Sequence, residues 1–200
     1  KENFTANSSD LPQESLSPGT EKMSSLEEEV FSRLIPKFNS LRINMNEFEG
    51  VYTREEIDRD KQAIKNKKSQ FESKYSPVYR RAQILEALLA EQIELSEWFG
   101  KDAFSIVPTE YDDLYHGVDL TTEFRHDDTL RHLAIGVDVT TSQGASLVDK
   151  LLLIRKKLEK GELTEIKYFT SENLPDFHGR MTNIPSVVMG MDIRTIHELA

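Results

Sequence analysis

The chain has 200 residues, enough for one sizeable hydrophobic core plus an appendage. It holds no cysteine, which excludes disulfides, zinc–thiolate centres and cysteine nucleophiles, and its net charge of −10 argues against a polyanionic partner unless basic residues are concentrated locally. No apolar stretch reaches the roughly 18–20 residues that a membrane span needs. Residues 1–25 contain no apolar signal core, so we expect a soluble, cytoplasmic protein without membrane contact.

The N-terminal part divides into a tail and a helical arm. Residues 1–24 are rich in Ser, Thr, Asn, Pro and Glu, a composition typical of disordered or peripheral segments. A helix is expected to follow, with Pro36 bending or ending it. A second helix begins after Thr53, because Thr53 and Glu56 form a capping box. Its few apolar residues recur every seven positions, which predicts a helical arm over 25–77 that lies along the core or along a partner chain, including a second copy.

The remaining residues, 78–200, predict one α/β domain. A long amphipathic helix that stops at Gly100 comes first, and short apolar runs alternate with helical patterns after it. We expect a helix, three strands, a helix, two strands and a short helix at 78–99, 104–107, 118–124, 133–140, 147–158, 165–169, 186–190 and 193–199. A charged tip joins the second and third strands. Because the second helix leads back to the sheet, this order predicts a mixed sheet flanked by helices.

Two of the expected strands carry an acid within an apolar run. Asp119 lies in Gly-Val-Asp-Leu and Asp138 in Ile-Gly-Val-Asp-Val-Thr. Burying an ionised carboxylate without a partner costs several kcal/mol, so two such acids on neighbouring strands suggest a shared cation. The alternative is that each acid caps a strand end or pairs with an arginine such as Arg125 or Arg131.

These blocks resemble the PD-(D/E)XK nuclease superfamily, whose restriction-endonuclease-like core is a helix, a three-stranded meander, a crossover helix and a further strand. Residues 78 to about 190 match that order. The residues that carry the resemblance are Leu-Glu-Ala-Leu-Leu at 85–89, Tyr-Asp-Asp at 111–113, and the two acid-bearing blocks at 117–120 and 136–140. Together with Ile-Pro-Ser-Val-Val-Met-Gly-Met-Asp at 184–192, the latter blocks are similar to bacterial members whose substrate is not known.

The resemblance implies a set of site residues. Asp119 falls on the acid of the first half-motif, Asp138 on the acid of the second, and Glu86 on a carboxylate that many members carry on the helix. It implies that Asp119, Asp138, Glu86 and the Val139 carbonyl bind Mg²⁺ or Mn²⁺, which take hard oxygen ligands. The metal would lower the pKa of a bound water and neutralise charge on the phosphate during in-line attack. Glu91 replaces Glu86 if the helix is rotated.

The chain departs from the superfamily at Thr140. A lysine that orients or activates the attacking water usually stands there, and a threonine cannot supply that cation. Lys150 is the best substitute, because the 147–158 helix is expected to pack over the Asp138 strand; Lys167 is a weaker one, and a plain surface lysine is the alternative interpretation. We therefore expect a metal-dependent nuclease acting on phosphodiester bonds, or a catalytically inactive nuclease-fold module for protein or nucleic-acid interaction.

Two basic helices offer contacts for DNA or RNA. Residues 54–81 hold nine Lys or Arg against five acids, and 150–160 hold a second cluster. Phosphate contacts need local cations rather than a basic total, although solvated helix faces are the simpler explanation of either cluster taken alone. His116 is a candidate general base, but a lone histidine in a loop is more often neither a ligand nor a base. Asp112 and Asp113 are interpreted as a turn or an N-cap, not as metal ligands.

Overall fold

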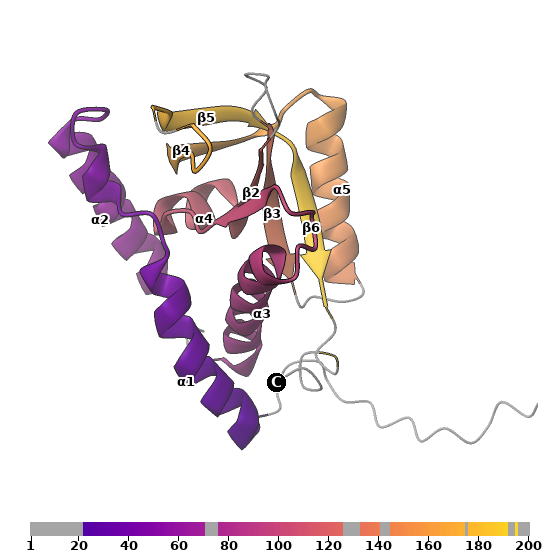
Figure 1. Cartoon of the computed structure of the whole chain (residues 1–200). Coiled ribbons are helices and arrows are strands. Elements are labelled where there is room, and N and C mark those ends of the chain that lie inside the picture. Colours follow the sequence, from indigo (N-terminus) through magenta and orange to yellow (C-terminus); the bar gives the residue numbers. More distant parts are fainter. Residues whose placement is uncertain are drawn as a thin grey trace, which may run out of the picture.

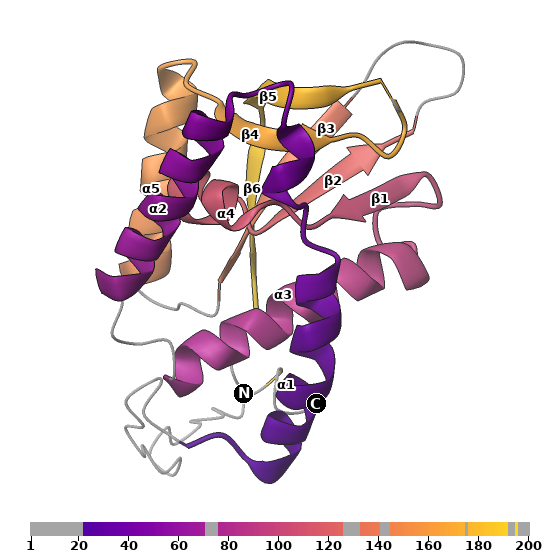
Figure 2. The same cartoon turned by 90° about the vertical axis from the view of Figure 1, so that its left-hand side faces the viewer.

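The structure, a computed structural model, describes residues 22–70, 76–125, 133–140, 145–174, 176–191 and 195. Three predicted features lie outside these residues: most of the N-terminal tail, the charged hairpin tip beyond Arg125, and all but residue 195 of the last helix. The helices and strands, labelled in Figure 1 except for β1, which is labelled in Figure 2, and the 3₁₀ helix η1 are α1 Ser25–Ser40, η1 Met45–Phe48, α2 Arg54–Gln70, α3 Pro77–Leu95, β1 Ala103–Ile106, α4 Glu110–His116, β2 Leu120–Phe124, β3 Leu133–Thr140, α5 Ala145–Glu159, β4 Thr164–Thr170, β5 His178–Ile184 and β6 Ser186–Gly190.

The main sheet is mixed and has four strands in the order β1-β2-β3-β6. β1, β2 and β3 form an antiparallel meander, and β6 pairs in parallel with β3. A parallel neighbour requires a crossover connection, and α5 together with the separate β4–β5 hairpin supplies it. The predicted α/β class and mixed sheet are therefore confirmed.

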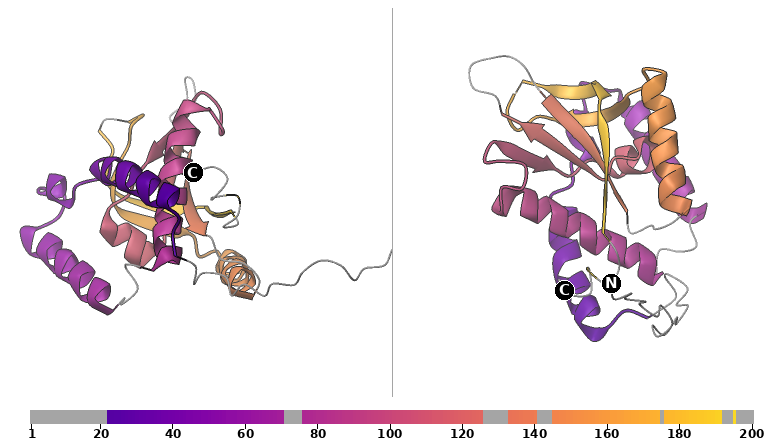
Figure 3. Two further views of the ribbon diagram at one scale, coloured as in Figure 1. Left: turned by 90° about the horizontal axis from the view of Figure 1, so that it is seen from below. Right: turned by 90° about the vertical axis from the view of Figure 1, so that its right-hand side faces the viewer.

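The largest core cluster joins α1, α3 and the sheet. Figure 2 and the right-hand view of Figure 3 show α3 running crosswise to the strands, with α1 on its other side. Phe38 of α1, Ile84 and Leu85 of α3, and Val137 and Val139 of β3 are buried together. Since side chains alternate across a strand, Asp138 points to the opposite face from these two valines. Core packing thus fixes the direction of one candidate acid.

Helix α1 continues through Pro36 to Ser40, so of the two predicted effects of this proline, a bend or an end, the helix end does not occur. Proline in a helix interior removes one hydrogen bond at a cost of about 3 kcal/mol. Ile35 and Phe38, which flank it, are buried in the α1–α3 core, and this packing outweighs the loss. A buried ion pair also holds α1 to α3, because Arg81 of α3 donates a hydrogen bond from Nε to Oε1 of Glu27 at 2.6 Å.

Helix α2 lies along the core of its own chain, one of the two placements left open by the sequence. The predicted capping box is present, with Thr53 N donating to Glu56 Oε2 at 3.0 Å and Glu56 N donating to Thr53 Oγ1 at 3.2 Å. Ile57 and Ile64, two of the apolar residues that recur every seven positions in this helix, are buried against η1 and Tyr168 of β4. Both residues are therefore already packed within the chain.

One buried carboxylate joins α4 to β4. Asp112 is 0% exposed and accepts four hydrogen bonds: from Thr109 Oγ1 at 2.7 Å, His116 Nδ1 at 2.7 Å, Lys167 N at 2.6 Å and Tyr168 N at 3.2 Å. Two of these donors are backbone groups of a strand that is remote in sequence. The carboxylate therefore substitutes for a strand partner and holds α4 against the hairpin.

Several predicted boundaries differ from the structure. Helix α3 ends at Leu95 with Ser96 as its C-cap, so Gly100 is not the helix stop but part of the following turn, where its N–H donates to the Glu97 carbonyl at 2.7 Å. The helix α4 and the strand β5 are absent from the prediction, because each is short and carries few apolar residues.

Helix α5 is present, but most of its leucines do not pack on the sheet. Leu151 is 49% exposed and Leu152 is 54% exposed. Figure 1 shows α5 standing beside β6 at the side of the molecule. Among the described residues, no helix combines the length and apolar character needed to cross a membrane.

Replacing Asp112 with alanine is expected to destabilise the protein by about 3–5 kcal/mol, because it strands buried N–H donors on β4 and frees α4. Glu110 of the same helix is the control, because its pair with Lys68 is partly exposed, and Glu110→Ala should change the unfolding free energy by about 1 kcal/mol or less. Urea denaturation followed by circular dichroism measures both. Equal midpoints for the two variants would contradict this role of Asp112.

The Glu27–Arg81 pair makes stability depend on acid pH. Hydrogen bonds from Arg81 lower the pKa of Glu27 to about 2, against about 4.5 in the unfolded chain. The stabilisation is therefore complete above about pH 4.5 and is lost as the pH falls toward 2. Near neutral pH, Glu27→Gln should lower the unfolding free energy by about 2–4 kcal/mol, and the difference from the parent should shrink below pH 4.5.

The adjacent Glu28 pairs with Arg80 at the surface, so Glu28→Gln serves as the control and should cost less than about 1 kcal/mol at any pH. A Glu27→Gln effect that stays constant between pH 3 and pH 7 would show that charge is not its cause.

Candidate active site

A cavity of about 620 Å³ lies where the N-terminal helices, α3, α4, the main sheet and α5 meet. The candidate residues Glu86, Asp119, Asp138, Val139 and Lys150 all line it. The sequence separates these residues by up to 64 positions, and the fold brings them to one cavity. The other lining residues are Asn39, Arg42, Lys68, Tyr79, Gln83, Glu110, Asp113 and Leu114.

Backbone hydrogen bonds to β3 hold Asp119, the acid of the first Gly-Val-Asp block. Asp119 stands just before β2, where its N–H donates to the Val137 carbonyl at 3.0 Å. Its Oδ2 accepts a hydrogen bond from Val139 N at 2.6 Å. The Asp119 carboxylate is thereby fixed directly beside the residue that follows Asp138 on β3.

Lys150 reaches the cavity from α5. Its Nζ lies 2.6 Å from Oδ1 of Asp138, and both side chains are about two-thirds or more buried. Asp138 faces α5 because its neighbours on β3 face α3, so the strand period itself directs the pair together. A lysine amine therefore lies beside Asp138, although the residue two positions after Asp138 is Thr140.

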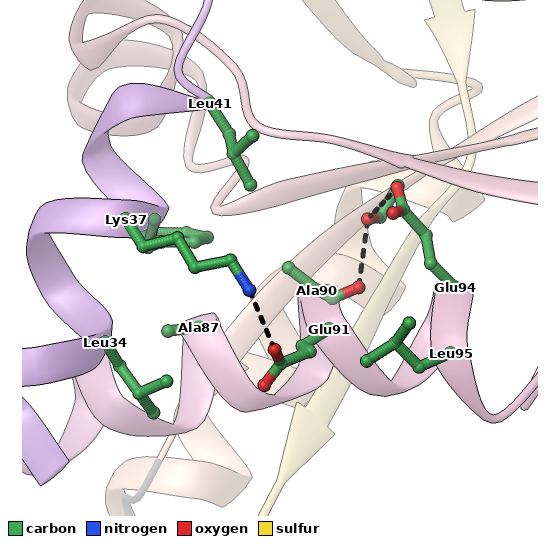
Figure 4. Close-up of a pocket in the computed structure, with 10 residues that line it drawn as sticks. Leu34, Lys37, Leu41, Ala87, Ala90, Glu91, Glu94 and Leu95 are labelled. Carbon is green, nitrogen blue, oxygen red and sulfur yellow. Dashed lines mark hydrogen bonds and ion pairs between the residues drawn. The ribbon is translucent and has the colours of Figure 1, made fainter.

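Glu86 faces the site cavity, and Glu91 does not. Figure 4 shows Glu91 in a separate cavity of about 190 Å³ between α1 and α3, where it pairs with Lys37 at 3.0 Å. Glu94 of the same helix accepts a hydrogen bond from Ser105 Oγ at 2.9 Å. Of the helix glutamates weighed from the sequence, Glu86 is thus the one directed to Asp119 and Asp138.

Asp113 is a site residue that sequence reasoning missed. It was interpreted with Asp112 as a turn or an N-cap, but both lie on α4, where successive residues point about 100° apart. Asp112 therefore enters the core while Asp113 enters the cavity. The signal was present in the sequence: Thr109 is followed three residues later by Asp112, and its hydroxyl accepts a hydrogen bond from Asp112 N at 3.2 Å, the signature of a helix N-cap.

Three cations surround the acids, and each is paired with one of them. Arg42 Nη1 donates to Asp113 Oδ2 at 3.2 Å and to the Pro108 carbonyl at 3.1 Å. Lys68 pairs with Glu110, and Lys150 with Asp138. Two carboxylates that line the cavity, Glu86 and Asp119, stand outside these three ion pairs, so the described lining residues include more acids than cations.

Burial and the excess of acids raise the pKa values of three carboxyl groups in the cavity. Burial, then the nearby charges of Asp113 and Asp138, raise the pKa of Asp119 to about 7. Burial together with Asp119 and Asp113 raises the pKa of Glu86 well above its usual value. Burial also raises the pKa of Asp113, although Arg42 opposes this shift. The folded chain therefore holds these carboxylates at an electrostatic cost.

The donor set fits a hard divalent cation in part. Hydrogen bonds from described residues engage Oδ2 of Asp119 and Oδ1 of Asp138, which leaves the other oxygen of each for a cation. Within the described ranges, however, no three histidine, cysteine, aspartate or glutamate side chains are grouped so that they could hold a metal. Two carboxylate oxygens, the Val139 carbonyl and waters are consistent with the coordination that Mg²⁺ accepts.

Other residues considered from the sequence lie elsewhere. Lys167 is buried in an ion pair with Asp60 of α2. His116 lines a different cavity and lies between Asp112 and Glu165. Arg125 donates a hydrogen bond from Nε to Asn173 Oδ1 at 3.1 Å, and its alternative pairing with Asp119 or Asp138 is not found among the described residues. The other arginine considered, Arg131, lies outside those residues.

No family model, curated protein or solved structure matches this chain. A functional inference therefore has to come from the residues that line the cavity and from their chemistry.

Replacing Asp119 with asparagine is expected to stabilise the metal-free protein at alkaline pH. The pKa of Asp119 is higher in the folded state than its usual value of 3.8, so folded-state stability falls as the pH rises from about 4 through about 7. Asp119→Asn removes that dependence and still offers an oxygen to Val139 N. The variant should gain on the order of 1–3 kcal/mol over the parent at pH 8 and little at pH 4.

Urea denaturation at both pH values in the presence of a chelator measures this difference. Asp149→Asn, on the exposed side of α5, is the control and should show no such pH-dependent gain. A gain of equal size at pH 4 and pH 8 would contradict the assigned electrostatics.

Proposed function

We propose that the protein is a metal-dependent nuclease, or a nuclease-like hydrolase, that acts on phosphodiester bonds with Mg²⁺ or Mn²⁺. The observation that carries this proposal is the shared cavity: Asp119 from the segment just before β2, Asp138 from β3 and Lys150 from α5 all line it. Their lining has an excess of carboxylates that a divalent cation would neutralise. Such an arrangement is costly for stability, which is typical of functional sites.

The order of elements supports the finer proposal of a restriction-endonuclease-like core. Helix α3, the meander β1-β2-β3, the crossover helix α5 and the parallel strand β6 follow one another as the resemblance implies. On this interpretation α4 and the β4–β5 hairpin are additions to the core, and α1 and α2 form the N-terminal arm. Asp119 and Asp138 then occupy the two half-motif positions.

Each side chain at the site has a different role in the proposed reaction. When bound, the divalent cation lowers the pKa of a water ligand and neutralises charge on the phosphate. Asp119 and Asp138 supply its carboxylate oxygens. The Nζ of Lys150 can donate a hydrogen bond to the attacking water or to a phosphate oxygen. Glu86, whose pKa is raised, can hold a proton and release it to the departing oxygen.

Cations around the cavity favour a phosphate-bearing substrate. Lys68 and Arg42 lie on the side of the N-terminal helices, and Lys150 lies on the side of α5. These residues belong to the basic regions 54–81 and 150–160 or stand next to them in space. Local cations of this kind can bind DNA or RNA in spite of the net charge of −10.

The second candidate is a catalytically inactive module that binds a protein or a nucleic acid. Thr140 and the missing three-ligand group among the described residues favour it. A protein partner or a second copy would need a surface other than Ile57 and Ile64 of the arm, which are buried within the chain. The exposed leucines of α5 are the more accessible apolar surface.

Cleavage of labelled single-stranded and duplex oligonucleotides with Mg²⁺ or Mn²⁺ tests the proposal. The parent protein should cut at least one substrate, and a chelator should stop the reaction. Asp119→Asn and Asp138→Asn should each lower the rate at least about 100-fold, and Lys150→Met about 100- to 1,000-fold, because each removes a charged group at the reacting phosphate. Asp149→Asn and Lys101→Met, which are exposed and outside the cavity, should retain the parent rate.

Calorimetry with Mg²⁺ separates the two candidates. Binding that is lost in Asp138→Asn supports a metal site. Intact substrates under all conditions, combined with no Mg²⁺ binding, would overturn the nuclease proposal and favour the inactive module.

A further inference from the structure

We propose that the substrate enters this cavity as a single strand of nucleic acid, with one unpaired base stacked on Tyr79 of α3. The inference rests on the proposed function for the identity of the reacting group. It adds the substrate class, which follows from the size of the cavity, from its walls and from one face of α3.

The size of the cavity limits what can reach the acids. Pockets of roughly 300–1,000 Å³ enclose a drug-sized molecule, and about 620 Å³ lies within that range. A nucleotide belongs to this size class, whereas a base pair with both backbones does not. A single unpaired nucleotide can therefore be enclosed together with the phosphate that meets Asp119 and Asp138.

The walls that enclose the cavity are fixed to the rest of the chain. Arg42, directly after α1, forms part of one wall and is tied to Asp113 and to the Pro108 carbonyl. Lys68 of α2 forms another part and pairs with Glu110 of α4. A rigid duplex would have to displace both contacts, but a flexible single strand would not.

One face of α3 offers the groups that an unpaired nucleotide needs. Tyr79, Gln83 and Glu86 recur at helical spacing and all line the cavity. Tyr79 is 44% exposed, so its ring is open to a base. Gln83 lies between the stacking ring and the acid, where its amide can bond to a base edge.

Basic residues continue beyond the cavity in two directions. Lys65 lies one turn before Lys68 on α2, and Arg155, Lys156 and Lys157 follow Lys150 on α5, all of them beyond the cavity wall. Figure 1 shows α2 and α5 on opposite sides of the molecule, with α4 and the strands between them. A chain of phosphates can therefore leave the cavity along either helix. This favours a polynucleotide over a free nucleotide, and stacking plus backbone cations is the usual mode of single-strand binding.

Fluorescence anisotropy in a chelator at low salt tests binding apart from cleavage. Labelled oligo-dT and oligo-U of twelve nucleotides are compared with a blunt duplex of the same length. We expect at least one single strand to bind the parent protein about 10-fold or more tighter than the duplex. Tyr79→Ala should weaken single-strand binding about 5- to 100-fold, whereas Tyr79→Phe should retain it.

Trp98→Ala is the control, because Trp98 is an exposed aromatic residue beyond the far end of α3 and outside the cavity. It should bind single strands as the parent does. Gln83→Ala should weaken binding less than Tyr79→Ala, and circular dichroism verifies that each variant is folded.

The outcomes separate this inference from the proposed function. Equal affinity for single strands and duplex, an unchanged affinity in Tyr79→Ala, or competition by free dTMP as strong as by oligo-dT would each overturn the inference, even if the protein cuts nucleic acid. Selective single-strand binding that depends on Tyr79 supports it. If that binding is found and no substrate is cut with Mg²⁺ or Mn²⁺, the nuclease proposal fails and the single-strand site stands.

Discussion

The carboxylate of Asp112 is the constraint on which the arrangement of the site depends. It binds backbone N–H groups of Lys167 and Tyr168, and the side chains of the same two residues bond to Asp60 of α2. A single buried junction thus joins α2, α4 and β4. Because Asp113 follows Asp112 on α4, the junction also sets one wall of the acidic cavity. Loss of a fully buried acceptor leaves several donors unsatisfied, so this junction forms as a whole or not at all.

Ionised carboxylates are destabilised in the cavity, whereas the ion pair of Glu27 with Arg81 stabilises one elsewhere in the fold. The Glu27–Arg81 pair lowers the pKa of its carboxyl and stabilises the ionised form. In the cavity, burial and like charges raise the pKa of Asp119 and Glu86, so their ionised forms are destabilised. A fold retains such a cost where a ligand or a reaction uses it. These unfavourable electrostatics distinguish the cavity, as a candidate site, from the Glu27–Arg81 pair.

Features encoded by residues close together in the sequence could be predicted, whereas features that depend on tertiary packing could not. The capping box of Thr53 and Glu56, the meander strands and the α5 helix were all predictable, since each is encoded by residues within one or two turns. The continuation of α1 through Pro36 was not, because it depends on packing against α3. The exposed leucines of α5 also escaped prediction, because an apolar helix face shows that burial is favourable but not that a partner surface exists within the chain.

By itself the sequence determined the α/β class, the two acids in their Gly-Val-Asp blocks and the threonine, in place of a lysine, at position 140. Period-two alternation even set the face on which Asp138 lies. Only the tertiary structure decided that Lys150 reaches Asp138, that Glu86 and not Glu91 faces the acids, and that Asp113, Arg42 and Tyr79 join them. Most of those relations connect residues that are 12 or more positions apart in the sequence, and no local propensity encodes such distances. They follow from how α3, α4 and α5 pack around one sheet.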